Sequence, residues 1–330
     1  MPLNKIPRLR EPRGPIVQQV RDLFLEREFK SAPEEFYQED IKLVENMDFM
    51  VQRCVIMQRK DVEASVKMLT QLLKWRKEKK LYELRDISFP QELTLSGAAF
   101  LYENDKYGNK MLYLRVFLCK SCSELKPALK DFLTYLLFKL DDPKDGQTYS
   151  IVMDLTNATL SNYDVELLMH VVNSLKDNFP VNMDYFLAVN FPWILSAGWA
   201  LIKRLIPSEK RDAVQFINSN KIFDYVAKEN CPDFLGGTCT RPYSYIDEDA
   251  PTTVEFLKEG LTKKRMFEIF NMFTETLPKE HLNKLKQQIE AVDDEQTTNQ
   301  KKTVIGDALH SNNNNGEDLN KSPSLRQESH

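Results

Sequence analysis

Glycine, cysteine and histidine are all scarce in this sequence of 330 residues, which contains 10, 5 and 4 of them respectively. No GxGxxG or GxxxxGK[ST] arrangement occurs, so the loops that hold phosphates in many nucleotide-dependent enzymes are missing. No HExxH or GxSxG motif is present either. These absences predict a protein that is not an enzyme, with no cofactor, no metal and no catalytic residue.

An excess of basic residues is also lacking, because 45 Lys and Arg stand against 49 Asp and Glu, for a net charge of −4. This balance argues against a nucleic-acid partner, since phosphate contacts need a basic face. Five cysteines are too few for a disulfide framework and indicate a reducing compartment. Cys119 and Cys122 form a lone CxxC before a predicted helix. We expect ordinary reduced thiols, and the alternative is a redox-active pair.

A long uninterrupted apolar segment is missing as well. The longest uncharged stretch, residues 185–202, is broken by Asn190-Phe191-Pro192 and is interpreted as a strand followed by a helix rather than a membrane span. The amino terminus has no apolar core of signal-peptide length. We therefore expect a cytoplasmic protein.

Five segments differ in composition and periodicity. They are a basic arm and first helix (1–33), a small helical bundle (34–90), an α/β domain (91–245), C-terminal helices (246–290) and a disordered tail (291–330). In the bundle, Asp61 is the expected N-cap of a helix that ends near residue 80. The tail is rich in Asn, Asp, Glu and Ser and cannot bury enough apolar surface to fold.

The α/β domain is predicted from alternating short apolar runs and longer helical patterns. Strands are expected at 98–103, 111–118, 149–155, 185–189 and 213–217, and helices at 125–140, 165–175, 193–206 and 222–228. This alternation predicts right-handed crossovers and a mostly parallel sheet. Asp154 ends one strand without a visible acid, base or metal partner, so we expect it to accept hydrogen bonds from the following loop. His170 is expected to be a surface or hydrogen-bonded residue.

The predicted helix at 193–206 is apolar on nearly every side, since Ser196 and Gly198 are the exceptions between Trp193 and Ile202. Two interpretations stay open. One is a buried helix of a large core, and the other is a lid that closes over an apolar ligand and touches a membrane. Four basic residues around the end of this helix are candidates for contact with lipid phosphates, namely Lys203, Arg204, Lys210 and Arg211.

Four motifs occur in a fixed order: residues 58–64 leading to 73–76, the strand ending at Asp154, the Asn190-Phe191-Pro192 tripeptide, and residues 231–237 with Gly236-Gly237. Together they resemble the CRAL-TRIO lipid-binding family, whose members bind retinaldehyde, tocopherol or phosphatidylinositol. The resemblance covers about residues 36–243. It implies an α/β domain with an apolar cavity, closed by a mobile gate helix, and a lipid as cargo.

The resemblance also implies residues for the cavity and the gate, which are Val165, Leu168, Met169, Val172, Trp193, Ile194, Ala197 and Leu201. The implied partners are a hydrophobic lipid ligand and, transiently, a membrane surface. Phosphatidylinositol binders of the family carry a Glu and a Lys where this chain has Val181 and Ala213, so we expect a different cargo. The alternative is an interaction scaffold with little or no lipid, which holds a protein partner through the C-terminal helices or tail.

Overall fold

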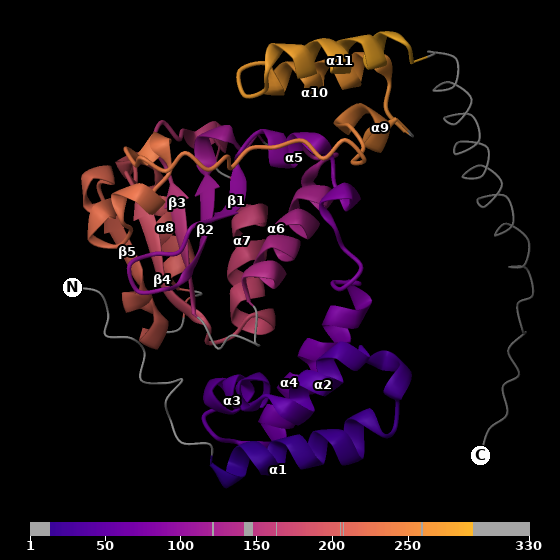
Figure 1. Ribbon diagram of the computed structural model, residues 1–330, viewed down its shortest axis with the longest axis vertical. Coiled ribbons are helices and arrows are strands. Elements are labelled where there is room, and N and C mark those ends of the chain that lie inside the picture. The colour runs from indigo at the N-terminus through magenta and orange to yellow at the C-terminus, as the bar shows by residue number, and fades with distance from the viewer. Residues whose placement is uncertain are drawn as a thin grey trace, which may run out of the picture.

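The computed structural model describes residues 14–292 except 121, 142–147, 163, 205, 207 and 259, and it leaves undescribed the side chains of 195, 197, 198, 201, 202 and 208–210. The predicted basic arm up to residue 13 and the predicted tail from residue 293 lie outside the described residues. Figure 1 shows a helical bundle at one end, a sheet with its covering helices in the middle, and the helix pair α10 (Lys263–Phe273) and α11 (Lys279–Glu290) at the other end.

The amino-terminal bundle consists of α1 (Pro15–Leu23), α2 (Gln38–Asn46), α3 (Asp48–Met57) and α4 (Val62–Glu78). Apolar residues at helical spacing, such as Val20, Val44 and Leu73, are fully buried in its core. Asp61 caps α4, as predicted, because its Oδ1 accepts a hydrogen bond from the Ala64 backbone N–H at 2.9 Å.

The central sheet contains β1 (Ala99–Tyr102), β2 (Lys110–Arg115), β3 (Tyr149–Asp154), β4 (Met183–Val189) and β5 (Val214–Ile217), in the order β1-β2-β3-β4-β5. β1 pairs with β2 antiparallel, and the other three pairings are parallel. The predicted α/β class with a mostly parallel sheet is confirmed. β2 is shorter than predicted because Val116–Leu118 forms a 3-10 turn.

The sequential strand order places the crossover helices on one face. Right-handed connections between neighbouring parallel strands all cross on the same side. α6 (Lys126–Leu140) and α7 (Val165–Asn173) accordingly pack beside each other there (Figure 1). Leu112, Leu114 and Ile151 point toward α6 in one core, whereas the alternating Tyr113 and Val152 belong to the core on the other face.

The other face of the sheet is covered by residues 219–243. Ile222 and Val226 are fully buried against the sheet. The predicted helix at 222–228 is wrong, because this segment forms the 3-10 turns Ser219–Asp224 and Lys228–Asn230. Ile222 and Val226 keep the spacing of a helical turn, but the backbone is extended at Ala227 (φ −64°, ψ 145°), which ends the first turn.

A buried cluster of charges joins the bundle to the α/β domain. Asp141, which follows α6, binds Arg53 of α3 through both carboxylate oxygens at 3.1 and 2.8 Å. Arg76 of α4 lies 3.5 Å from the same carboxylate and donates to Asp40 at 2.8 Å. Asn182 adds a hydrogen bond to Asp141 at 3.0 Å. All four charged side chains are fully buried, so each charge depends on its partners rather than on water.

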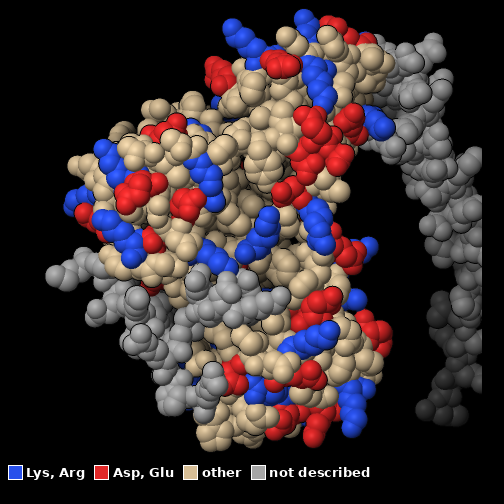
Figure 2. All heavy atoms as spheres, in the orientation of Figure 1, with Lys and Arg blue, Asp and Glu red and all other residues tan. Residues whose placement is uncertain are grey.

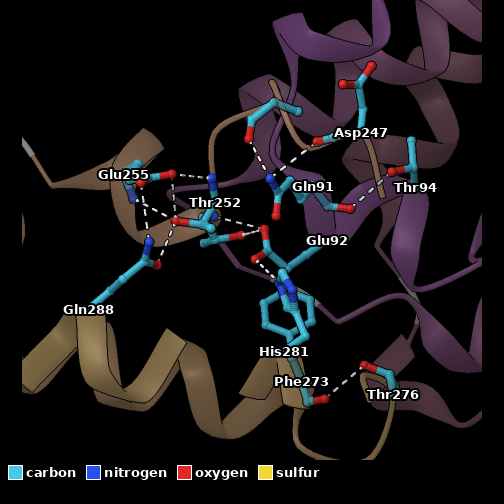
Figure 3. Close-up of polar contacts among 12 residues, drawn as sticks. Gln91, Glu92, Thr94, Asp247, Thr252, Glu255, Phe273, Thr276, His281 and Gln288 are labelled. Atoms are coloured by element: carbon cyan, nitrogen blue, oxygen red, sulfur yellow. Dashed lines mark hydrogen bonds and ion pairs between the residues drawn. The ribbon is translucent and has the colours of Figure 1, made fainter. Parts of the chain in front are cut away.

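The C-terminal helices are attached to α5 (Gln91–Leu95) by a second buried network, drawn in Figure 3. Glu92 Oε1 lies 2.6 Å from His281 Nε2 of α11, and both side chains are almost fully buried. Glu92 Oε2 accepts from the backbone N–H of Thr253 at 2.8 Å and from its hydroxyl at 2.6 Å, at the start of α9 (Thr253–Leu257). One carboxylate therefore fastens both α9 and α11 to the α/β domain.

Charged side chains of both signs are interspersed over the face of the molecule that Figure 2 displays. The pair Arg265–Glu124 links α10 to the segment before α6, with nitrogen–oxygen distances of 2.7 and 3.1 Å. Hydrogen bonding by Arg265 lowers the pKa of Glu124 well below its ordinary value. The C-terminal helices thus contact the α/β domain at two places, α5 and the start of α6.

Candidate functional site

An apolar cavity of about 270 Å³ lies between the sheet and the helices on its α6–α7 face. Among the strand residues that form its floor are Leu114, Met153, Phe186, Ala188, Val214 and Phe216. They point to this face because side chains alternate along each strand. The floor therefore follows from the same period-two pattern that builds the sheet.

Helices α6 and α7 form the facing walls. Leu129 and Leu133 contribute from α6, and Leu168 and Val172 contribute from α7 at a spacing of four residues, which places both on one side of the helix. Phe179, close to the start of β4, also lines the cavity. Its ring packs edge-on against Trp75 of α4, with centroids 5.7 Å apart, so the bundle supports this part of the wall.

The structure places the sequence-predicted residues of α7 in two groups. Leu168 and Val172 lie on the cavity wall, whereas Val165 is exposed and Met169 lies outside the wall. Val165 is the first residue of α7. At about 100° per residue, Leu167, Leu168, Val171 and Val172 share one stripe along α7, and Met169 falls outside that stripe.

The helix predicted at residues 193–206 is shorter than expected. Residues Trp193–Leu195 form a 3-10 turn, and α8 covers only Ser196–Lys203. Trp193 is 83% exposed and Ile194 44% exposed, so neither side chain is buried in the cavity. The predicted side chains of Ala197 and Leu201 lie outside the described residues.

Two residues of this segment that the sequence analysis missed line the cavity, Trp199 and Ile206. The Trp199 ring packs edge-on against Phe216 of β5, with centroids 4.8 Å apart, and Phe191 contacts the same ring at 5.0 Å. An aromatic cluster therefore holds α8 against the sheet edge. The sequence does show Trp199 as an aromatic residue within the apolar run. The side of the helix on which Trp199 lies depends on where the preceding 3-10 turn ends.

The basic residues after α8 take different positions. Lys203 and Arg204 are exposed. Arg211 is half-buried, and its Nε donates to the Ile206 carbonyl at 3.0 Å. The predicted side chain of Lys210 lies outside the described residues. Lys203 and Arg204 are therefore the members of this group that the structure shows to be accessible.

Asn190 fixes the chain where β4 ends and the α8 segment begins. It has a left-handed backbone (φ 53°), which Asn tolerates better than most residues. Its side chain accepts from the Ser219 backbone N–H at 2.9 Å and donates to Thr156 at 2.8 Å. Asn190 thus ties together the loops that follow three neighbouring strands, directly before the predicted gate.

Two further motif residues have structural roles. Asp154 Oδ1 accepts from the backbone N–H and the hydroxyl of Thr156 at 3.0 and 2.5 Å, as the sequence analysis expected. Gly237 lies so close to Cys231 that a Cβ would meet the Cys231 carbonyl oxygen at 1.8 Å. The closing Gly-Gly motif therefore allows the chain to pack on itself behind the sheet.

The titratable residues singled out in the sequence are also accounted for. His170 Nε2 lies 3.0 Å from the Lys130 carbonyl oxygen and 2.9 Å from the Thr134 hydroxyl, and burial lowers its pKa. Cys119 and Cys122 both line the cavity, and burial raises the pKa of both thiols. A raised pKa keeps a thiol protonated and poorly nucleophilic.

In the described part of the chain, no three His, Cys, Asp or Glu side chains come together as a metal site. Among the helices described, none combines the length and the apolar character needed to cross a bilayer.

Comparison with known proteins gives a consistent match. Residues 95–237 match the family model of the CRAL/TRIO domain. The chain is 23% identical over 219 residues to a CRAL-TRIO domain-containing protein of Schizosaccharomyces pombe, covering 62% of this chain and 49% of that protein. It is 24% identical over 220 residues to Patellin-1 of Arabidopsis thaliana, covering 61% and 37%. The chain thus spans about half the length, or less, of these curated relatives.

The crystal structure of Sfh5 has a similar fold, with a TM-score of 0.52 at 14% sequence identity, covering 81% of this chain and all of that one.

Proposed function

Residues 95–237 of this chain form a CRAL/TRIO domain, and on that premise we propose that the protein binds a lipid or another hydrophobic small molecule in the cavity. The ligand is cargo in this proposal, carried or presented rather than chemically changed. The motifs by which this chain resembles lipid-binding members of the family support the proposal.

The observation that carries the proposal is the cavity itself. The cavity has a volume of about 270 Å³ and lies between a sheet and its helices, where protein interiors are normally close-packed. Its walls are mostly apolar, so water inside it would find few hydrogen-bond partners. A bound hydrocarbon chain would cover these walls and gain about 0.8 kcal/mol for each buried CH₂.

We propose that the segment from Trp193 to Ile206 is the gate. Trp199 and Ile206 face the cavity, while Trp193 and Ile194 are exposed on the outside. A segment with apolar side chains on both sides suits a lid that meets ligand inside and a membrane outside. Exposed Trp favours the membrane–water interface, and nearby basic Lys203 favours anionic lipid headgroups.

The test is purification of the full chain from cells under native conditions, followed by lipid extraction and mass spectrometry. We expect one class of hydrophobic molecule at close to one per protein. Repeated recovery of lipid-free protein that also fails to take up lipid from vesicles would contradict the proposal. That result would favour the interaction scaffold, with the docked α9–α11 helices as the surface to examine next.

A further inference from the structure

Polar side chains gather at one end of the cavity. The polar wall residues are Ser96, Cys119, Lys120, Cys122, Lys126, Asn162 and Asp164, together with Lys176. The first seven lie near the carboxyl ends of the parallel strands, because they follow β2 and β3 or precede the antiparallel β1. We call these seven residues the polar edge. Lys176 follows α7 and therefore lies toward the opposite end, near the start of β4.

The cations of the polar edge differ in how they are neutralised. Lys126 Nζ lies 3.0 Å from Asp164 Oδ2 and 3.0 Å from Glu166 Oε2, and these contacts raise the pKa of Lys126. Lys120 is half-buried, and its Nζ lies 5.3 Å from the centroid of the Phe117 ring. Among the described residues, no carboxylate is paired with Lys120.

The other polar groups of this edge do not supply a compensating charge. Burial and the charge of Asp164 raise the pKa of Cys119 to about 11, so that thiol is neutral. Asn162 already donates to the carbonyl oxygens of Phe117 and Cys119 at 3.1 and 3.0 Å. Glu124 is held by Arg265. The wall at the polar edge therefore carries one surplus positive charge, that of Lys120.

The size of the cavity limits what the rest of the ligand can be. Its volume of about 270 Å³ lies just below the usual range for small-molecule pockets, about 300–1,000 Å³. One hydrocarbon chain can follow the apolar wall from the polar edge toward Phe179, whereas two chains need about double the room.

We infer that the cargo is a single-chain amphiphile with one negative charge in its headgroup, bound with that headgroup at Lys120 and its chain along α6 and α7. This inference rests on the proposed function and specifies its ligand. A fatty-acid carboxylate and the phosphodiester of a lysophospholipid share the required chemistry. A charge-assisted hydrogen bond to Lys120 would satisfy the surplus cation and orient the chain inward.

The test measures equilibrium binding to delipidated full-length protein for four probes: oleate, oleyl alcohol, oleoyl-lysophosphatidylglycerol and dioleoylphosphatidylcholine. We expect tighter binding of the two single-chain anions than of oleyl alcohol or the two-chain lipid. Comparison of oleate with the lysophospholipid then separates a carboxylate headgroup from a phosphodiester headgroup.

Three variants locate the headgroup. Lys120→Gln should weaken binding of the preferred anion about 10- to 100-fold and leave oleyl alcohol within about twofold, because a hydrogen bond to a charged group is lost. Lys120→Arg should restore most of the affinity. The matched control is Lys176→Gln, which removes a wall lysine at the opposite end and should leave binding of every probe unchanged.

Equal effects of Lys120→Gln and Lys176→Gln on the anion, or no preference for anion over alcohol, would overturn the inference. Binding of dioleoylphosphatidylcholine in preference to every single-chain probe would also overturn it, while leaving the proposed function intact. Failure of all four probes to bind would also overturn the inference, and the proposed function would fall with it only if native purification likewise yielded no bound hydrophobic molecule.

Discussion

Asp141→Asn tests the buried charge cluster that joins the bundle to the α/β domain. Asp141 is 1% exposed and neutralises Arg53 through two contacts of 3.1 and 2.8 Å. With Asn in its place, the cluster would keep the two cations Arg53 and Arg76 but only one carboxylate, Asp40, which is paired with Arg76. One guanidinium charge would then be buried without compensation.

The expected cost follows from burial. Removing one partner of a fully buried ion pair destabilises a protein by about 3–5 kcal/mol. A typical domain has a free energy of unfolding of only about 5–15 kcal/mol, so the loss should be large. The matched control is Glu63→Gln. Glu63 binds Arg27 through two contacts of 3.1 and 2.8 Å, but the two side chains are 67% and 45% exposed, and such pairs contribute about 0–1 kcal/mol.

The assay is equilibrium urea unfolding of the wild-type protein and both variants, followed by far-ultraviolet circular dichroism and by tryptophan fluorescence. Of the three tryptophans, Trp75 lies on α4 and contacts Phe179, so its part of the fluorescence reports on the junction between bundle and α/β domain. We expect a much lower urea midpoint for Asp141→Asn and almost no shift for Glu63→Gln. Equal midpoints for the two variants would refute the argument, because geometry alone would then set the value of an ion pair.

Three further changes probe other parts of the fold. Gly237→Ala should destabilise the protein by about 1–3 kcal/mol or more, measured by thermal unfolding, because the new Cβ would overlap the Cys231 carbonyl. Glu92→Ala should speed hydrogen exchange in α9 and α11 at least about tenfold while β2–β4 stay protected. The reason is that His281 and the first residue of α9 lose a buried hydrogen-bond acceptor. Unchanged exchange would contradict the role of this carboxylate. Lys203→Glu should slow lipid transfer to anionic vesicles about tenfold at low salt and have little effect at high salt. An equal effect at both salt concentrations would argue against a membrane contact at Lys203.

Much of the α/β domain could be predicted from the sequence because its signals are local. Short apolar runs alternate with helical patterns, and the strands at β3 and β4 begin and end within two residues of the predicted bounds. Asp61 and Asp154 have the hydrogen bonds expected of an N-cap and of a strand-end carboxylate. These features depend on neighbours in the chain, which a sequence displays directly.

The side chains that face the cavity were harder to predict, because their directions depend on helix geometry. The expectation of one α-helix from residue 193 assumes 3.6 residues per turn, but Trp193–Leu195 is a 3-10 turn with three. Over three residues the two geometries differ by about 60° in direction. The sequence pattern therefore did not determine which side of this segment faces the cavity, and the structure places Trp199 there and leaves Trp193 exposed.

Contacts between distant segments left no pattern in the sequence. Asp141 and Arg53 are separated by 88 residues, and Glu92 and His281 by 189. Each looks like an ordinary surface charge in its own helix or loop, because periodicity shows only whether a position is apolar. The two buried networks that attach the bundle and the C-terminal helices therefore became visible only in three dimensions.

Native mass spectrometry of the intact protein, with and without a large side chain in the cavity, tests the central claim most directly. Leu168→Trp places an indole into the cavity from α7, whereas Val165→Trp places one on the exposed side of the same helix. The account predicts one bound hydrophobic molecule on the wild-type protein and on Val165→Trp, and little or none on a folded Leu168→Trp variant. Equal ligand content in all three proteins, or none in any of them, would contradict it.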